Sequence, residues 1–148
     1  MLIMLDKKDK IILEELQKNA RNSTKNIATK VKIPRVTVHD RIQKMIKNGI
    51  IKKFNVKIDH KKIGLNSNVF IFVSFLHNTD VSQRELANRI SKITGVYEVH
   101  IISGEYDLLL KVRGTSLEEI GRLVIDKLRE LKGVGRTLTC ACFETVKE

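Results

Sequence analysis

The chain has 148 residues, a hydrophobic content of 42% and a formal net charge of +11. That hydrophobic content is typical of a folded protein and excludes a disordered tail. No apolar run approaches the ~20 residues that cross a bilayer, and the N-terminus lacks the pattern of a signal peptide. We therefore expect a cytoplasmic protein with no membrane partner.

The excess charge lies entirely in the first 63 residues, where 17 Lys and Arg face six Asp and Glu, a net charge of +11. The rest of the chain carries 11 residues of each sign. A basic first part joined to a neutral second part predicts two modules, of which the first meets a polyanion. Charge alone leaves nucleic acid, an acidic membrane surface and an acidic protein open.

The first module begins with two predicted helices. Asp6 is placed to cap a helix that runs to Asn19, with Asp9 in its first turn. Ser23 or Thr24 is placed to cap a short second helix.

A third helix is predicted after a tight turn at Lys32 and Ile33. Pro34 opens this helix, because proline tolerates the first helical position. Its apolar stripe consists of Val38, Ile42 and Met45. The pair Asn48-Gly49 ends it, with the glycine in the left-handed conformation.

From residue 50 the period changes. Phe54, Val56 and Ile58 alternate with polar residues, which predicts a strand or an extended connector, followed by a polar linker that contains Gly64. Beyond the linker we predict strands at 69–76, 96–103, 108–113 and 136–146, and helices at 82–93 and 116–131. The order βαββαβ is typical of a ferredoxin-like domain, with four antiparallel strands and two helices on one face.

The predicted fold class is therefore α+β, with an N-terminal helix-turn-helix of three helices and a C-terminal ferredoxin-like βαββαβ domain. We expect residues 1–50 to form the helix-turn-helix domain, 51–67 the connector, and 68–148 the ferredoxin-like domain.

The short helix pair with a tight turn is the feature that points to DNA. Such a pair projects its second helix into a major groove. Candidate base contacts on that helix are Arg35, Val36, Thr37, His39 and Gln43, with Asp40 beside them. Candidate phosphate contacts around it are Lys25, Lys30, Lys32, Lys44 and Lys47. The alternative is a packing unit with a solvated basic face. A basic membrane helix is disfavoured, because the stripe is short and lacks Trp and Phe.

The strand at 69–76 is apolar on both faces, whereas two helices cover only one face of a sheet. The simplest cover for the other face is the same sheet of a second subunit, which predicts a homodimer. The alternative is that the connector covers this face within one chain.

The turn Gly104-Glu-Tyr-Asp107 is either a ligand-binding edge or an ordinary hairpin turn. Cys140 and Cys142 are expected to fill a core or an interface, and the four histidines show no ligand or catalytic spacing. We therefore predict no metal site, no cofactor and no catalytic residue.

These residues together resemble the leucine-responsive regulatory protein/AsnC family of transcription regulators. The resemblance begins with Met4-Leu5-Asp6 and Asp9, continues with Thr37-Val38 and Arg41-Ile42, and returns at Ser103-Gly-Glu-Tyr-Asp107 and at Thr137 and Thr139. It leaves both Met1 and Met4 as candidate start residues.

The resemblance implies a sequence-specific regulator that binds double-stranded DNA and meets the transcription machinery. It also implies dimers that assemble into tetramers or octamers. An amino-acid effector would bind at Gly104, Glu105, Tyr106, Asp107 and Thr139. The alternatives are an architectural DNA-compacting protein and, on overall layout, an enzyme like the sirohaem decarboxylases.

Three features depart from the pattern of this family. Lys32 replaces the usual turn glycine, and Glu105 replaces the commoner aspartate. The Ser-Pro that usually opens the recognition helix is shifted, which gives Pro34-Arg35. The operator and the effector therefore remain open.

Overall fold

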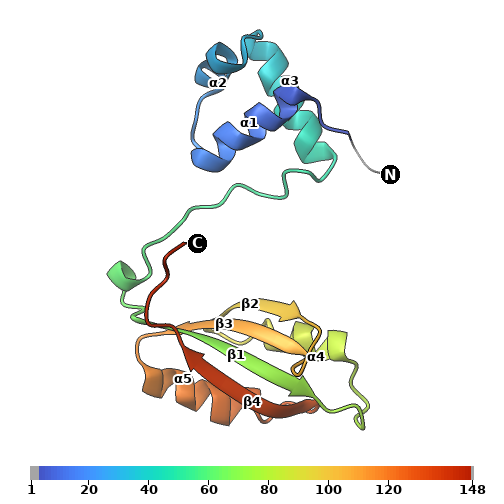
Figure 1. The fold of residues 1–148 in the computed structure, drawn as a ribbon, viewed down its shortest axis with the longest axis vertical. Helices are drawn as coiled ribbons and strands as arrows, with labels where there is room; N and C mark the ends of the chain where they lie inside the picture. Colours follow the sequence, from blue (N-terminus) through green and yellow to red (C-terminus); the bar gives the residue numbers. More distant parts are fainter. Residues whose placement is uncertain (1–3, 148) are drawn as a thin grey trace. The chain divides into compact units, whose positions relative to one another are not determined.

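The computed structural model describes residues 4–147, so the candidate start Met1 lies outside the described residues (Figure 1). The chain divides into two compact units, unit 1 up to Ile58 and unit 2 from Asp59 onward. Each unit has a hydrophobic core of its own.

Unit 1 begins with helix α1 (Lys7–Lys18), which carries a reciprocal cap at its start. The Asp9 amide donates to the Asp6 carboxylate at 2.8 Å, and the Asp6 amide donates back to the Asp9 carboxylate at 3.1 Å. This capping box satisfies two amides that the first turn would otherwise leave without partners.

Helix α2 (Thr24–Val31) is capped by Ser23, whose hydroxyl accepts from the Asn26 amide at 3.1 Å. Helix α3 (Arg35–Lys47) follows. Pro34 occupies its capping position rather than its first helical position, where the sequence analysis had placed it. The three helices meet in a small core whose buried side chains are Ile12, Ile27, Val31, Val38, Ile42 and Met45.

The turn between α2 and α3 depends on one left-handed residue. Lys32 has φ 54° and ψ 49°, and it is the only residue other than glycine with positive φ in the described chain. This conformation costs a residue with a Cβ about 1–2 kcal/mol, so the packing of the helices must compensate for it. Gly49, with φ 70°, ends α3 in the same region of backbone space without that cost.

Glu15 is the buried acid of unit 1. Its carboxylate pairs with the ammonium groups of Lys30 on α2 and, at 3.3 Å, of Lys18. The Asn22 amide also donates to it at 3.4 Å. The bond from Lys30 contributes most to lowering the pKa of Glu15 below its usual range. Glu15 therefore ties α1 to α2 as an anion.

Unit 2 has the predicted ferredoxin-like order. Its four-stranded antiparallel sheet has the order β2-β3-β1-β4, and both helices cover one face (Figure 1). The elements are β1 (Ser67–Phe75), α4 (Gln83–Ile90), β2 (Val96–Ile101), β3 (Leu108–Gly114), α5 (Leu117–Leu123) and β4 (Val134–Ala141). The fold class expected from the sequence is confirmed.

Several elements have other bounds than predicted, and α4, for example, ends at Ile90 rather than at residue 93. The last strand stops at Ala141 rather than Val146, because the Cys142 amide makes the final bond to β1, at the Asn68 carbonyl. The second strand stops at Ile101, where the backbone turns. The last helix changes to a wider π turn over Val124–Leu128, which keeps both of those side chains buried against the sheet.

The alternating segment after α3 is an extended connector and not a strand, because the described structure gives it no strand partner. Its apolar side chains are therefore uncovered, with Phe54 51% and Val56 85% exposed.

The two faces of the sheet differ as the sequence suggested. Val69, Ile71 and Val73 are fully buried beneath the helices. Phe70 and Phe72 alternate with them and therefore lie on the other face, which no helix covers. We call this the open face. The strand register adds two β4 residues to it, since Leu138 pairs with Phe72 and Cys140 with Phe70.

Replacing Glu15 with Gln tests the link between α1 and α2. A carboxylate whose pKa is lower in the folded state stabilises the fold above its ordinary pKa, and that stability is lost as the pH falls. The wild-type protein should therefore lose stability below about pH 4.5, the ordinary value for Glu. E15Q should be less stable at neutral pH and should depend less on pH in the acid range. Urea unfolding from pH 7 to pH 3 measures the free energy of unfolding of both proteins. If it changes with pH in the same way in the wild type and in E15Q, the ionised Glu15 does not stabilise the fold.

Candidate nucleic-acid interface

Helix α3 presents one face to its own core and the opposite face to solvent. Val36, Asp40, Gln43 and Lys47 follow one another at i, i+4, i+7 and i+11, opposite the buried stripe. All four are exposed, and Val36 is 70% exposed although it is apolar. We call this set the outer face of α3. In that order, its side chains present the methyl groups of a valine, a carboxylate, an amide and an ammonium group.

The other predicted contacts on α3 lie beside this face. His39 and Lys44 are exposed, whereas Thr37 is half-buried. The structure therefore brings together on one helix surface most of the side chains that the sequence singled out.

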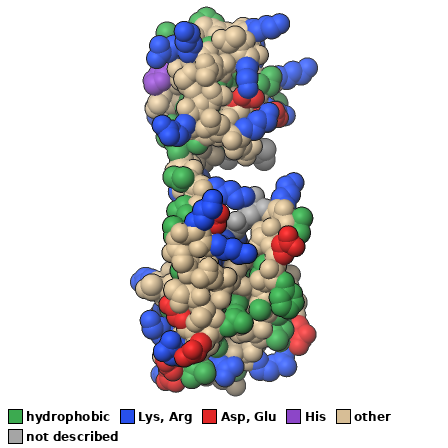
Figure 2. All heavy atoms as spheres, turned by 90° about the vertical axis from the view of Figure 1, so that its left-hand side faces the viewer, with side chains coloured by type: hydrophobic (Ala, Val, Ile, Leu, Met, Phe, Trp, Pro, Cys, Tyr) green, Lys and Arg blue, Asp and Glu red, His purple; other side chains and the backbone are tan. Residues whose placement is uncertain are grey.

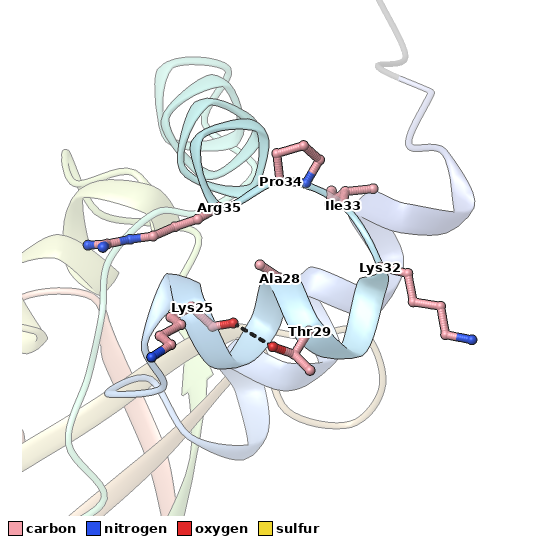
Figure 3. A pocket seen from close by; sticks show the side chains of 7 residues that line it. All are labelled: Lys25, Ala28, Thr29, Lys32, Ile33, Pro34 and Arg35. Carbon is pink, nitrogen blue, oxygen red and sulfur yellow. Dashed lines mark hydrogen bonds between the residues drawn. The ribbon is translucent and has the colours of Figure 1, made fainter.

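A concave surface lies between α2 and the start of α3 (Figure 3). This α2–α3 groove has a cavity volume of about 470 Å³ and is lined by Lys25, Ala28, Thr29, Lys32, Ile33, Pro34 and Arg35. Lys25 and Arg35 extend toward one side in Figure 3, and Lys32 points away on the other. Three cations and no acid line the groove, so its field favours an anion.

Arg35 belongs to this groove rather than to the outer face of α3. Its Nε donates to the Thr24 hydroxyl at 3.1 Å, which holds the side chain against the first turn of α2. The N-terminus of α3 lies next to it and has no side-chain cap. Uncapped amides at a helix start attract anions through their N–H groups and through the helix dipole. The arrangement is suited to a phosphate.

Some cations of unit 1 pair with acids within the fold instead. One guanidinium nitrogen of Arg41 donates to Asp6 at 2.6 Å and to Asp9 at 2.7 Å, which joins α3 to the start of α1. The bond to Asp6 contributes most to raising the pKa of Arg41. Lys30, which the sequence grouped with the phosphate contacts, pairs with Glu15. Figure 2 shows Lys and Arg side chains projecting from the surface of unit 1.

Three residues of the loop predicted to bind an effector make contacts with the sheet of unit 2. The Asp107 carboxylate accepts from the Phe75 amide at 2.7 Å and so holds the end of β1. Glu105 pairs with Arg136 of β4 at 3.2 Å. The ring of Tyr106 lies near two side chains: the guanidinium carbon of Arg136 is 5.7 Å from its centre, and the centre of the Phe72 ring is 5.5 Å away.

The predicted effector residues are only partly brought together. Gly104, with φ 130°, shapes the loop, and nothing lies within 4 Å of the position where a Cβ would stand. Thr139 pairs with the buried Ile71 and therefore lies on the helix-covered face of the sheet. Phe72, which contacts Tyr106, lies on the open face. Arg136 is the residue that sequence analysis missed, because only the fold places it beside the loop.

The remaining chemistry is limited in the described residues. Among residues 4–147, no three His, Cys, Asp or Glu side chains gather where a metal ion could bind. No helix in that range combines the length and hydropathy needed to cross a membrane. Cys140 is exposed and Cys142 half-buried, both as free thiols.

Comparison with known proteins identifies both units. Residues 5–52 match the model of a winged helix-turn-helix DNA-binding domain. Residues 68–148 match the Lrp/AsnC ligand-binding domain.

The matching relatives span nearly the whole chain. An HTH-type transcriptional regulator of Pyrococcus horikoshii is 51% identical over 145 residues, covering 98% of this chain and 97% of the relative. The HTH-type transcriptional regulator LysM of Saccharolobus solfataricus is 35% identical, with 95% of each chain covered.

Solved structures share the fold at lower identity. A transcriptional regulator of Neisseria meningitidis in complex with L-Met has a TM-score of 0.91 and 24% identity, covering 98% of this chain and 94% of that one. AsnC of E. coli has a TM-score of 0.87 and 23% identity, covering 99% and 97%. The chain therefore belongs to the Lrp/AsnC family of DNA-binding transcriptional regulators, as its sequence resemblance predicted.

Proposed function

We propose that the outer face of α3 recognises base edges in the major groove of an operator. The observation that carries this proposal is that Val36, Asp40 and Gln43 stand exposed on the side of α3 opposite its core. A Gln amide suits adenine, a carboxylate accepts from the amino group of cytosine, and an apolar side chain meets a thymine methyl. Each group of the face therefore has a base it can distinguish.

The α2–α3 groove would hold a backbone phosphate next to that contact. Lys25, Lys32 and Arg35 supply three positive charges around the uncapped start of α3. A phosphate contact fixes where the helix sits but carries no sequence information. Because Thr24 holds Arg35 in this groove, we assign Arg35 to phosphate rather than to guanine.

Two copies would associate through the open face. Membership of the family supports an oligomer, and an uncovered surface with Phe70, Phe72 and Leu138 supports this sheet as the interface. The buried apolar area drives such an association. A two-fold pair of reading helices would then match a palindromic operator.

A small effector, such as an amino acid, would bind at the Gly104–Asp107 loop together with Arg136. Glu105 suits an ammonium group, Arg136 a carboxylate, and Tyr106 an apolar side chain. Asp107 is committed to the Phe75 amide and would position the loop. Such a regulator would act in the cytoplasm and meet the transcription machinery beside a promoter.

Gln43→Ala and Lys25→Ala should separate base recognition from phosphate binding. Q43A should lose about 1–3 kcal/mol on a selected operator and nothing on random DNA. K25A should weaken both alike and reduce the slope of log affinity against log salt by about 0.9. Fluorescence anisotropy at several salt concentrations measures both, after selection of the operator from random fragments. Equal wild-type affinity for operator and random DNA would instead favour an architectural protein.

Phe72→Asp should dissociate the dimer, because it puts a charge into an apolar interface. Sedimentation should show monomers for F72D, and its operator affinity should fall at least tenfold because one reading helix remains per complex. Val146→Asp is the matched control, since Val146 is 92% exposed and outside the sheet. A dimeric F72D protein would remove the open face as the interface.

Tyr106→Ala should abolish effector binding. If one of the twenty amino acids binds, a concentration 100 times its Kd should stabilise the wild type by about 2.7 kcal/mol, which a thermal melt detects. Tyr97→Ala is the control, because Arg113 stacks on Tyr97 at 5.6 Å much as Arg136 does on Tyr106. The proposal fails if Y106A keeps the response, or if no amino acid shifts the wild type.

A further inference from the structure

The open face of the sheet carries a buried charge at its centre. The strand register sets one row of side chains across the four strands, consisting of Glu98 on β2, Lys111 on β3, Phe70 on β1 and Cys140 on β4. Lys111 is the middle residue of β3, which is one of the two central strands (Figure 1). It is 8% exposed, although no helix covers this face. A lysine thus occupies the middle of the surface on which Phe70 lies.

Glu98 supplies the opposite charge. One of its carboxylate oxygens lies 3.4 Å from the Lys111 ammonium, and the other lies 3.0 Å from His100 Nε2. The His100 contact contributes most to holding the pKa of Glu98 below its usual range, so Glu98 is an anion at neutral pH. The side chain of Glu98 is 48% exposed. Water therefore solvates this carboxylate in a single chain, and covering the open face would remove that water.

The ion pair lies between two other rows of the open face. On one side, Leu109 and Leu138 flank Phe72 in an apolar row, and on the other side Arg113 pairs with Asn68. A charge at the centre of an interface is unusual, because interface cores are depleted of charged residues. Burial of an ion pair also adds little stability. We therefore expect the pair to affect which partner fits rather than how much apolar area is buried.

We propose that Glu98 and Lys111 make the open face selective for a second copy of this chain. The proposal rests on the dimer through the open face. A two-fold axis between identical sheets runs through the middle of the interface, so a central residue lies near its own copy. Two Lys111 ammonium groups would repel each other there. One Glu98 carboxylate from each chain leaves the centre with no net charge.

A partner with other side chains at these two positions fits less well. A purely apolar surface would strip water from Glu98 and Lys111 without offering either an opposite charge. A partner with two cations at these positions would leave a net positive charge in the interface, and one with two acids a net negative charge. Self-association is favoured because each chain brings both signs.

The test uses two full-length variants with opposite charge errors. Glu98→Lys gives each chain two central cations, and Lys111→Glu gives each chain two central acids. Each variant alone should dimerise at least tenfold more weakly than the wild type. An equimolar mixture should recover dimers that contain one chain of each kind, because the charges then balance across the interface. Sedimentation equilibrium measures the association, and a tag on one variant identifies the mixed dimers.

Recovery in the mixture also shows that both chains fold. The milder variants E98Q and K111Q, mixed in the same way, apply if a charge-reversed chain does not fold alone. Glu85→Lys is the matched control, since Glu85 pairs with Arg89 on α4, on the covered side of the sheet, and is similarly exposed. E85K should dimerise like the wild type.

Two results would overturn the proposal. The first is wild-type association of E98K or K111E alone, which would mean that the interface tolerates the charge errors. The second is a mixture of folded variants that stays as weak as its components, which would confine the pair to stabilising a single chain. A dimeric F72D protein would instead remove the open face itself as the interface, so the two proposals fail by different results.

Discussion

The orientation of α3 is the constraint on which the function of unit 1 depends. A core of six buried side chains holds three short helices together, and it must fix α3 without using its outer face. A core this small has little stability to spare. Two ionic links supplement it: Glu15 with Lys30 joins α1 to α2, and Arg41 with Asp6 and Asp9 joins α1 to α3. The left-handed turn at Lys32 opposes them, since its backbone conformation is costly.

The parts of the fold that could be predicted were those with a local cause. Caps at Asp6 and Ser23 and the stripe of Val38, Ile42 and Met45 act within a few residues, so spacing alone located the helices. The two-sided hydrophobicity of β1 likewise anticipated an open face, because alternation along one strand is visible in the sequence.

The parts that escaped prediction depend on long-range neighbours. Arg41 meets Asp9 across 32 residues of chain, and Arg136 meets Glu105 across 31, so no local pattern marks either pair. The end of β4 is set by where β1 begins, and the face on which Thr139 lies follows from the register with Ile71. A family resemblance supplied the loop at Gly104 but not the arginine that lies over its tyrosine.

The difference in charge between the two units now has a structural basis. Unit 1 carries exposed cations around the α2–α3 groove and on α3, while three of its cations, Lys18, Lys30 and Arg41, pair with carboxylates within the fold. Unit 2 pairs many of its charges with one another, as in Glu98 with Lys111 and Glu105 with Arg136, and leaves an apolar sheet surface. Its surface is therefore suited to self-association rather than to a polyanion.

Asp40 lies within the outer face of α3, the face that we propose to read base edges. If that face enters the major groove, the Asp40 carboxylate would be repelled by the phosphates of a duplex with the wrong sequence and would find no cytosine amino group to compensate. The repulsion would shorten encounters with unrelated DNA, while the surrounding lysines would still attract the protein to the duplex. One negative charge in a positive field would then speed the search for the operator, because the protein would leave wrong positions quickly.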